Sequence, residues 1–344
     1  MTPQGIADAA HQVHGMRIVN ERPAAHALWY LGQGRAEIRP EATSNAAPGE
    51  VLVRALYGAI SRGTERLVFF GRVPEAEYER MRAPFMGGNF PHPVKYGYST
   101  VGRVENGPRE LVGRTVFALY PHQDLFVLAA DAVIPVPDGV PPQRAVLAAN
   151  METALNALWD ASPGPADRIA VVGAGVVGAL AARLCAQIPG TQVTLVDIEP
   201  GRAEIARALG VDFALPDAGP EACDLVIHAS ASAAGLNTAL RLAGLEATVV
   251  ELSWYGAGDV PVSLGGAFHS QRLRLVSSQV GHVATSHRAR WDFSRRRAAA
   301  LALLDDPALD CLIAPAISFD DLPAQLPQIL GPTSGALCQL IRYS

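Results

Sequence analysis

The chain has 344 residues, of which 49% are apolar and 18% are charged, and its formal net charge is −5. This length suits about two domains of about 150 residues each, and the apolar share predicts compact folding over most of the chain. The small negative charge and the lack of a sustained Lys/Arg block argue against a nucleic-acid partner, because little would attract phosphates.

Residues 1–16 are predicted to be a disordered N-terminal extension, and they contain no apolar stretch of signal-peptide length, so we expect a cytoplasmic location. From about residue 17 to 140, short alternating segments broken by Gly and Pro predict the strands and turns of a β-rich unit without a helix. The longest nearly uncharged apolar run, residues 169–182, is shorter than the ~18 to 20 residues that cross a bilayer, so no membrane span is expected.

A helix is predicted after Pro141 and Pro142, where apolar residues recur at helical spacing. Its apolar stripe consists of Met151, Ala154, Leu155 and Leu158. With that stripe buried, the polar residues left on the other sides are Asn150, Glu152, Thr153 and Asn156.

Between about residues 167 and 279, short β-branched runs alternate with segments of helical spacing. Such alternation predicts parallel strands joined by crossover helices, which is the doubly wound class of α/β fold. Residues 294–304 and 320–330 are expected to form two further helices, and the tail "CQLIRY" is expected to return as a strand.

The first strand of this region ends in a G-x-G-x-x-G motif that opens a helix. In such a motif the first glycine permits a tight turn, the second lets the backbone approach a pyrophosphate, and the third lets helix and strand pack closely. The helix N-terminus then offers unpaired N–H groups to the phosphates. We therefore expect Gly173, Gly175, Val177 and Gly178 to bind a dinucleotide; the alternative is a structural Gly-rich turn.

An acid follows the motif at the end of the next strand. Asp197 lies 19 residues after Gly178, where a carboxylate accepts hydrogen bonds from the adenosine ribose hydroxyls and repels a 2′-phosphate. Asp197 therefore favours NAD(H) over NADP(H), and Arg202 is close enough in sequence to flank the ribose.

These features together resemble the medium-chain dehydrogenase/reductase (alcohol dehydrogenase-like) superfamily. The resemblance covers the chain from residue 17 and implies an α/β fold in which a GroES-like β-rich catalytic domain (residues 17–150 and 292–344) joins a Rossmann NAD-binding domain (residues 151–291), with the active site between them. The loop "ISRGTERLVFFGRVP" followed by "GYSTVG" is most similar to the bacteriochlorophyllide 3-hydroxyethyl dehydrogenase group.

The chain departs from that family at the metal ligands. Positions that hold Cys, His and Glu in zinc-binding members hold Arg62, Tyr98 and Ser99 here, and only Glu152 remains as a coordinating group in the third-ligand region. Arginine keeps its proton and repels a cation, so the sequence predicts a zinc-independent member. His92 and His122 are the residues from which another metal site would have to be built; the alternative is that both are ordinary hydrogen-bonded histidines.

Other elements of the sequence agree with this exclusion. The four cysteines, Cys185, Cys223, Cys311 and Cys338, show no paired spacing, which argues against disulfides and a structural zinc site. The only lysine, Lys95, matches neither a Walker motif nor the Tyr-x-x-x-Lys pair of short-chain dehydrogenases.

Fixed hydrogen-bond donors can replace a Lewis acid at a reacting carbonyl. In our hypothesis Tyr98 or Thr64 gives a proton to the substrate oxygen, and Arg62 holds the oxyanion or an acidic substituent. Glu65 is expected to orient Arg62 or the loop backbone, and Glu152 with Thr153 is a secondary catalytic candidate. The alternative roles are structural, with Thr64 and Glu65 capping a helix, Arg62 pairing with Glu65, and Tyr98 packing under the turn.

Three functions remain open from the sequence: a zinc-free carbonyl/alcohol oxidoreductase, a quinone- or enoyl-type C=C reductase, and a dinucleotide-binding protein without turnover. The aromatic segment of residues 69–93 is either a substrate lid, which favours a bulky or planar small molecule, or a structural loop with an amphipathic helix. A homodimer is expected from the way this fold pairs.

Overall fold

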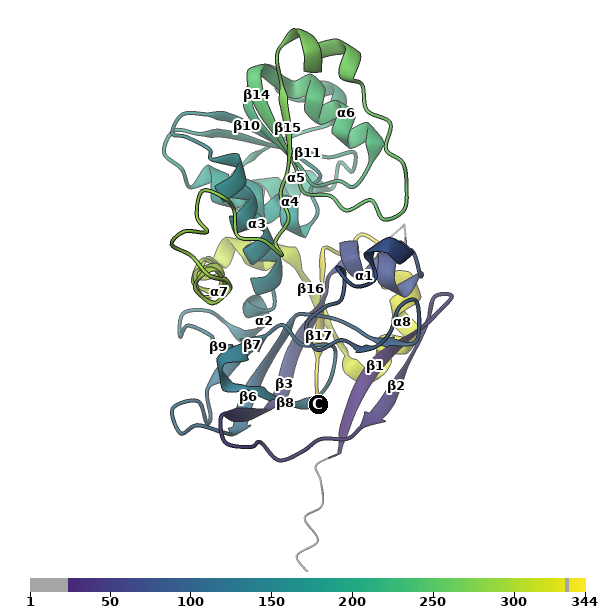
Figure 1. Cartoon of the computed structure of the whole chain (residues 1–344). Helices are drawn as coiled ribbons and strands as arrows, with labels where there is room; N and C mark the ends of the chain where they lie inside the picture. Colours follow the sequence, from purple (N-terminus) through teal and green to yellow (C-terminus); the bar gives the residue numbers. More distant parts are fainter. Residues whose placement is uncertain (1–23, 332–333) are drawn as a thin grey trace, which may run out of the picture.

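Two lobes make up the molecule in Figure 1: one is built on a parallel sheet, and the other, the antiparallel lobe, on sheets that are antiparallel except for one parallel strand pair. The computed structural model describes residues 24–331 and 334–344. The expected N-terminal extension, residues 1–16, lies outside the described residues. Among the residues that are described, no helix has both the length and the apolar character needed to span a bilayer.

The antiparallel lobe contains two sheets that bury alternate side chains between them. One sheet has the order β2-β1-β5-β4 and consists of β1 (Ala25–Gly32), β2 (Arg35–Glu41), β4 (Gly87–Gly88) and β5 (Val94–Lys95). The other has the order β16-β17-β3-β6-β7-β9, with β8 also paired to β3. Its strands are β3 (Glu50–Ile60), β6 (Thr100–Asn106), β7 (Thr115–Ala118), β8 (Leu125–Ala129), β9 (Val133–Pro135), β16 (Ile313–Ser318) and β17 (Cys338–Arg342).

The C-terminal segment returns to this lobe, as the sequence predicts. Strand β17 pairs antiparallel with β3, with Leu340 opposite Ala59. The end of β3 leads directly into the "SRGTE" loop, so the returning chain lies beside that loop.

The other lobe confirms the predicted doubly wound sheet. Its six strands are all parallel and have the order β12-β11-β10-β13-β14-β15. They are β10 (Arg168–Val172), β11 (Gln192–Val196), β12 (Asp212–Ala214), β13 (Cys223–His228), β14 (Ala243–Glu251) and β15 (Arg274–Ser277), and the crossover helices are α4 (Val176–Ala186), α5 (Arg202–Leu209) and α6 (Ala233–Leu242). Helices cover both faces, which is why the central strand β10 is apolar at consecutive positions.

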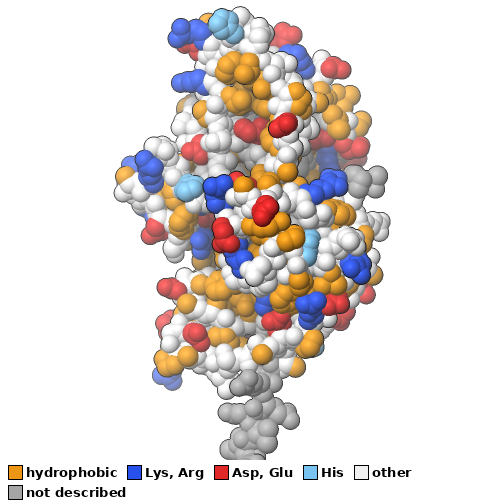
Figure 2. All heavy atoms as spheres, turned by 45° about the vertical axis from the view of Figure 1, so that its right-hand side comes forward, with side chains coloured by type: hydrophobic (Ala, Val, Ile, Leu, Met, Phe, Trp, Pro, Cys, Tyr) orange, Lys and Arg blue, Asp and Glu red, His pale blue; other side chains and the backbone are white. Residues whose placement is uncertain are grey.

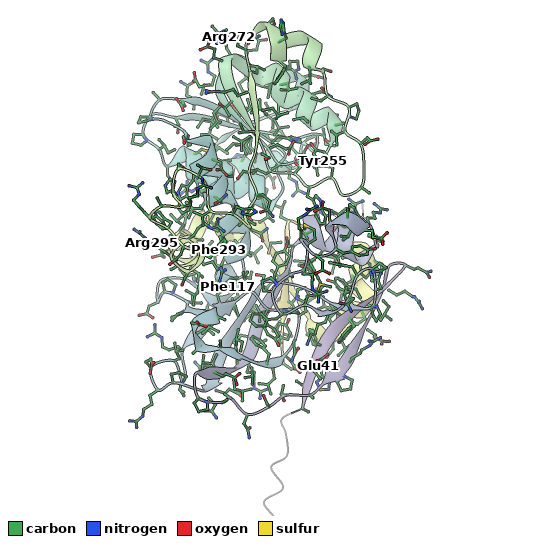
Figure 3. All side chains as sticks on the ribbon, in the orientation of Figure 1. Glu41, Phe117, Tyr255, Arg272, Phe293 and Arg295 are labelled. Carbon is green, nitrogen blue, oxygen red and sulfur yellow. The ribbon has the colours of Figure 1, made fainter. Side chains whose placement is uncertain are left out.

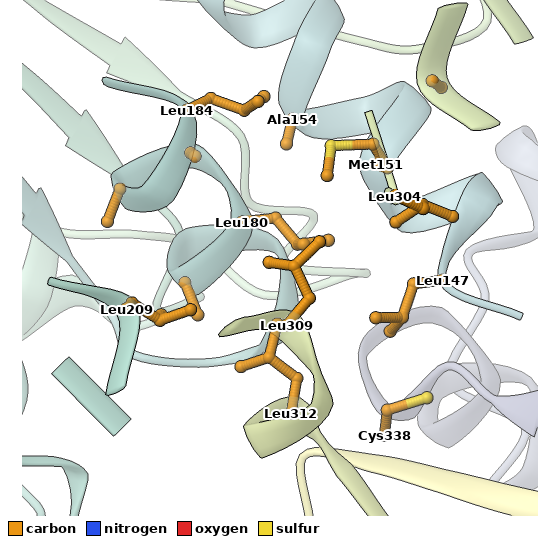
Figure 4. Close-up of a cluster of buried hydrophobic side chains, with 14 of the residues drawn as sticks. Leu147, Met151, Ala154, Leu180, Leu184, Leu209, Leu304, Leu309, Leu312 and Cys338 are labelled. Atoms are coloured by element: carbon orange, nitrogen blue, oxygen red, sulfur yellow. The ribbon is translucent and has the colours of Figure 1, made fainter. Parts of the chain in front are cut away.

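A hydrophobic cluster runs through the junction of the lobes (Figure 4). Leu147 and Met151 of the α3 region meet Leu180 of α4, while Leu309 and Leu312 of η5 (Pro307–Leu312) fill the space below them. The remaining helices here are α2 (Pro142–Ala145), α3 (Ala148–Ala161), α7 (Phe293–Ala302) and α8 (Leu322–Ile329). Helices α7 and α8 confirm the two helices expected after the parallel sheet.

One helix is missing from the sequence prediction. Residues after β3 form α1 (Arg62–Phe69), so the expectation of no helix before residue 140 is wrong. The inward residues of α1 are Glu65, Val68 and Phe69, which have helical spacing, but one of the three is acidic. A hydrophobic period therefore does not show over these two turns.

The polar sides of α3 are more buried than its apolar stripe indicates. Glu152 is 4% exposed and Asn156 is 1% exposed, because α7 packs on that side and supplies the Arg296 guanidinium. A charged partner thus permits burial of residues that a hydrophobic pattern assigns to solvent.

The aromatic segment of residues 69–93 contains a single 3₁₀ turn, η1 (Glu75–Glu77), instead of an amphipathic helix. Its rings pack on one another: Tyr78 and Phe90 have centroids 5.4 Å apart, and Phe90 lies 6.2 Å from Tyr96. Phe85 is the exposed member at 47%. The other short turns are η2 (Ala130–Ala132), η3 (Pro216–Ala218), η4 (Leu264–Phe268) and η6 (Phe319–Asp321).

Candidate active site

The glycine motif forms a tight turn between β10 and α4. Gly173 has a φ of +108°, a conformation that other residues rarely adopt. A Cβ placed on Gly178 would lie 1.9 Å from the Gly173 carbonyl oxygen, so only glycine lets the helix approach the strand this closely. A Cβ on Gly175 would meet nothing within 4 Å, which leaves open space where α4 begins. Val177, half-buried, lies in the first turn of α4.

Asp197 follows β11 and reaches back to this turn. Its Oδ2 accepts a hydrogen bond from the Ala174 amide at 2.7 Å, and its Oδ1 accepts one from the Glu199 amide at 2.9 Å. Each carboxylate oxygen can accept two bonds, so both retain capacity for ligand hydroxyls. Ile198 is 83% exposed, so the surface beside the carboxylate is open. The turn, the helix start and the carboxylate together fit a dinucleotide.

Three hydroxyl groups meet at the start of α1. The Ser61 and Thr64 hydroxyls hydrogen-bond to the phenol of half-buried Tyr98. Burial, together with the nearby Glu65 carboxylate, raises the pKa of Tyr98 to about 12, although the two hydroxyls oppose this shift. Thr64 and Tyr98, which the sequence analysis places in the reaction, are therefore adjacent.

The Glu65 carboxylate is completely buried behind this cluster. It accepts bonds from the Tyr30 hydroxyl, the Ser61 amide at 2.7 Å and Nε2 of His122 at 2.9 Å. The structure therefore ties Glu65 to the loop backbone at Ser61 and to the sheet, rather than to the Arg62 guanidinium. A Cβ on Gly97 would lie 2.7 Å from His122 Nε2, which shows how closely the chain covers this pair.

Arg62 fastens α1 to the returning C-terminal chain. Its guanidinium donates to the carbonyl oxygens of Ile329, Gly331 and Ala336, each at 3.0 Å. Burial and the neighbouring cations Arg66 and Arg202 lower the pKa of Arg62. Three of its five N–H groups are thus used within the chain, and two remain for another acceptor.

Positive charge gathers at this level of the molecule. Arg202 donates to the Gly335 carbonyl oxygen at 3.2 Å, and the buried Nε of Arg66 has no hydrogen-bond partner in the structure. Figure 2 shows Lys and Arg side chains at the level where the two lobes meet. The hydrogen bonds of Arg62 and Arg202 to the returning C-terminal chain go to neutral carbonyl groups, so the arrangement favours a negative group between the lobes.

Glu152 faces away from this cluster, toward α7. Its Oε1 accepts from Nε of Arg296 at 3.0 Å, and Arg297 lies 3.5 Å from its Oε2. Burial raises the pKa of Glu152, an effect that the two arginines only partly oppose. This buried ion pair joins two helices, and its placement favours a structural role over the secondary catalytic role proposed from sequence. The Thr153 hydroxyl donates to the Ala149 carbonyl of the same helix.

The donors at the family's metal positions do not suit zinc. Arg62 presents a guanidinium, Tyr98 a phenol, and buried Ser99 donates its hydroxyl to the Val146 carbonyl. Across residues 24–331 and 334–344, no group of three His, Cys, Asp or Glu side chains could hold a metal ion. His92 bonds the Val68 carbonyl at 3.0 Å, separately from the His122–Glu65 pair.

A cavity of about 350 Å³ lies between the loop after α1 and the loop after β14. Its lining includes Leu67, Arg72 and Val73 from one lobe and Tyr255 from the other. Figure 3 places Tyr255 at the edge of the parallel-sheet lobe that faces α1. Sequence reasoning missed Tyr255 and its partners His228 and Glu251; the polar residues that follow the apolar runs at the ends of β13 and β14 were the signal that could have found them.

Comparison with known proteins relates this architecture to dehydrogenases. No family model matches the chain. One relative, the 2-desacetyl-2-hydroxyethyl bacteriochlorophyllide A dehydrogenase of Rhodobacter capsulatus, is 28% identical over 257 residues, which make up 68% of this chain and 75% of the relative.

Solved structures confirm the expected fold class, a GroES-like unit with a doubly wound parallel sheet. L-idonate 5-dehydrogenase of Escherichia coli superposes with a TM-score of 0.76 at 14% identity, covering 93% of this chain and 99% of that structure. A structure from Sinorhizobium meliloti, described as a zinc-binding dehydrogenase and bound to NADP, has a TM-score of 0.75 at 18% identity, with 93% and 100% coverage. At these identities the likeness concerns the fold.

Proposed function

We propose that this chain, an oxidoreductase with the medium-chain dehydrogenase/reductase fold, transfers hydride between NAD(H) and a carbonyl or alcohol substrate without a catalytic zinc ion. The observation that carries this proposal is the Ser61–Thr64–Tyr98 hydroxyl cluster at the start of α1, in a chain whose other lobe holds a turn that fits a dinucleotide. When bound, the nicotinamide would supply or accept the hydride.

Tyr98 is the proposed proton donor to the substrate oxygen. The Ser61 and Thr64 hydroxyls lower the pKa of the phenol, and in the proposed arrangement both donate to its oxygen. The phenol proton is then free to point toward a reacting carbonyl oxygen. Arg62 and Arg66 add positive charge beside the position where negative charge would develop.

The direction of the reaction follows from the state of this phenol. With a pKa of about 12, Tyr98 holds its proton throughout the neutral range and is a poor base. Carbonyl reduction can therefore start from the protonated phenol of Tyr98, which is the form present at neutral pH. Alcohol oxidation would require Tyr98 to lose a proton that its surroundings hold tightly.

Asp197 supports NAD(H) as the preferred dinucleotide, because its carboxylate beside the glycine turn would accept the ribose hydroxyls and repel a 2′-phosphate. The name of the R. capsulatus relative gives bacteriochlorophyllide as that protein's substrate, which agrees with the bulky or planar small molecule expected here. The two unused N–H groups of Arg62 further favour a substrate that carries an acidic substituent.

The test is the Tyr98→Phe variant, assayed for NADH oxidation with a panel of ketones, enones and quinones. Loss of a general acid should lower kcat by about 10²- to 10⁴-fold while the affinity for NADH is unchanged. Tyr57→Phe is the matched control, since the Tyr57 hydroxyl contacts Gln143 outside the cluster. Full turnover of Tyr98→Phe on a good substrate would remove Tyr98 from the mechanism.

The same panel separates the two reductase chemistries. Oxidation of NADH with quinones or enones, while ketones stay inert, would assign C=C reduction instead. NADH binding without turnover on any member would favour the non-catalytic function.

Metal content tests the zinc-free part of the proposal. Purified protein is expected to contain substoichiometric zinc and to keep its activity after dialysis against a chelator. Stoichiometric zinc, with activity lost on chelation and restored by the ion, would contradict it.

A further inference from the structure

A second polar network, outside the Tyr98 cluster, lies at the carboxyl edge of the parallel sheet. His228 ends β13 and Glu251 ends β14, and the two residues are direct partners in the strand register. The His228 side chain is fully buried, and its Nδ1 lies 2.7 Å from Glu251 Oε2 while its Nε2 lies 2.7 Å from the Ser230 hydroxyl. Both ring nitrogens therefore have a partner.

The partners of Glu251 determine the tautomer of His228. The carboxylate also accepts the Tyr255 hydroxyl at 2.9 Å and the Ser253 amide at 2.6 Å, so it acts only as an acceptor. Nδ1 must then carry the proton that it donates to Glu251. In the neutral ring Nε2 is an acceptor, and the Ser230 hydroxyl donates to it.

The hydroxyl oxygen of Ser230 can accept one further hydrogen bond. The Ser232 hydroxyl lies 3.0 Å from Ser230 Oγ and itself accepts the Gly235 amide, so its proton is available to Ser230. One lone pair of Ser230 Oγ remains. A Cβ on Gly235 would lie 2.1 Å from this oxygen and 2.8 Å from His228 Nε2, so the network requires glycine at the start of α6.

The backbone of Ser230 borders the dinucleotide turn. A Cβ on Gly173 would lie 2.7 Å from the Ser230 amide nitrogen, so the residue after β13 packs directly on the first glycine of the motif. Asp197 follows β11, on one side of β10, and Ser230 follows β13 on the other side. A dinucleotide whose adenosine lies at Asp197 crosses β10 toward Ser230 with its nicotinamide half.

We propose that Glu251 and His228 orient Ser230 as a hydrogen-bond acceptor for an O–H or N–H donor on the nicotinamide half of the dinucleotide. Nicotinamide riboside offers such donors in its ribose hydroxyls and its carboxamide. Ser230 is thus a cofactor-binding residue, and His228 and Glu251 are positioning residues that act through it. This inference rests on the proposed dinucleotide-binding function.

The test is direct titration of the full chain with NADH and with ADP, which lacks the nicotinamide riboside. Ser230→Ala should bind NADH about five- to tenfold more weakly, the effect of about 1 kcal/mol for one hydrogen bond, and should bind ADP unchanged. Ser230→Thr keeps the hydroxyl and should restore NADH affinity. His228→Gln should resemble Ser230→Ala, because Ser230 loses its orientation.

Ser270→Ala is the matched control, since Ser270 precedes β15 at the opposite edge of the sheet and should bind both ligands as the parent does. Equal NADH affinity of Ser230→Ala and the parent would overturn the inference. Equal weakening of NADH and ADP would also overturn it, because the change would then reflect general distortion of the turn. If the parent itself fails to bind NADH, the proposed function fails and the inference falls with it.

Discussion

At the scale of single residues, Asp197 is expected to decide between the two dinucleotides. Its two oxygens are held by backbone amides beside the glycine turn, so the negative charge cannot turn away from a 2′-phosphate. Asp197→Ser should raise kcat/KM with NADPH relative to NADH by at least about tenfold, because about 1.4 kcal/mol of repulsion is removed.

The measurement is the ratio of the two specificity constants on one carbonyl substrate. Glu199→Gln serves as the control, since the Glu199 side chain only bonds the Gly201 amide nearby. A parent enzyme that already prefers NADPH would contradict the role given to Asp197.

The sequence pointed to Asp197, Arg62 and Glu65 as candidate site residues, but it did not indicate the groups that they contact. The spacing of the glycines and the acid at Asp197 follow from the chemistry of a dinucleotide-binding turn. This spacing is a short sequence motif, so it can be recognised from the sequence alone. Arg62 and Glu65 are three residues apart in sequence, yet Arg62 bonds carbonyls near residue 330 while Glu65 bonds Tyr30 and His122. Long-range contacts of this kind leave no periodic signal.

At the scale of elements, the pairing of α3 with α7 depends on a buried cation. Arg296, 1% exposed, donates to Glu152, Asn156 and the carbonyls of Val280 and His282. Arg296→Met removes every one of these bonds and leaves Glu152 with only the more distant Arg297. We expect it to lower the free energy of unfolding by about 3 to 5 kcal/mol.

Urea unfolding followed by circular dichroism measures this effect. Arg295→Met on the same helix is the control, because Arg295 is exposed and stacks on Trp291, and its cost should be far smaller. A variant of Arg296 as stable as the parent would show that α3 and α7 are held by their apolar contacts alone.

Helices and strands could be predicted where the sequence showed a long helical period or a regular alternation of strands and helices. The βα units of the parallel sheet bury one face per helix and both faces per strand, which produces a readable pattern. Helix α1 has two turns and an acidic inward residue, so its inward face is set by the Glu65 network and not by hydrophobicity. Burial of Glu152 on α3 escaped prediction for the same reason.

At the scale of the whole molecule, buried tyrosines should make stability sensitive to alkali. Burial is the main cause that raises the pKa of Tyr98 and Tyr120 to about 12, and it also raises the pKa of Tyr30, Tyr96 and Tyr343. An unfolded tyrosine ionises near pH 10. The stability contributed by Tyr98 and Tyr120 is therefore fully present below about pH 10 and is lost as the pH rises through about 12, and the other three phenols act in the same direction.

The measurement is the urea midpoint at a series of alkaline pH values, with tyrosinate absorbance recorded in parallel. All five tyrosines belong to the antiparallel lobe. One hydrophobic cluster nevertheless includes residues of both lobes, so we expect both lobes to unfold in a single transition. Tyr120→Phe should reduce the alkaline loss. A midpoint that stays constant up to pH 12 would contradict this account.

The three carbonyl bonds of Arg62 have a consequence for how the protein is made. Because the Arg62 guanidinium is a side chain of the protein itself, it can bond α1 to the returning C-terminal chain as soon as the polypeptide folds. Under the proposed mechanism no inorganic component has to be delivered, inserted or protected from competing ions during maturation. Cells starved of trace elements should then yield enzyme of the same specific activity as well-supplied cells.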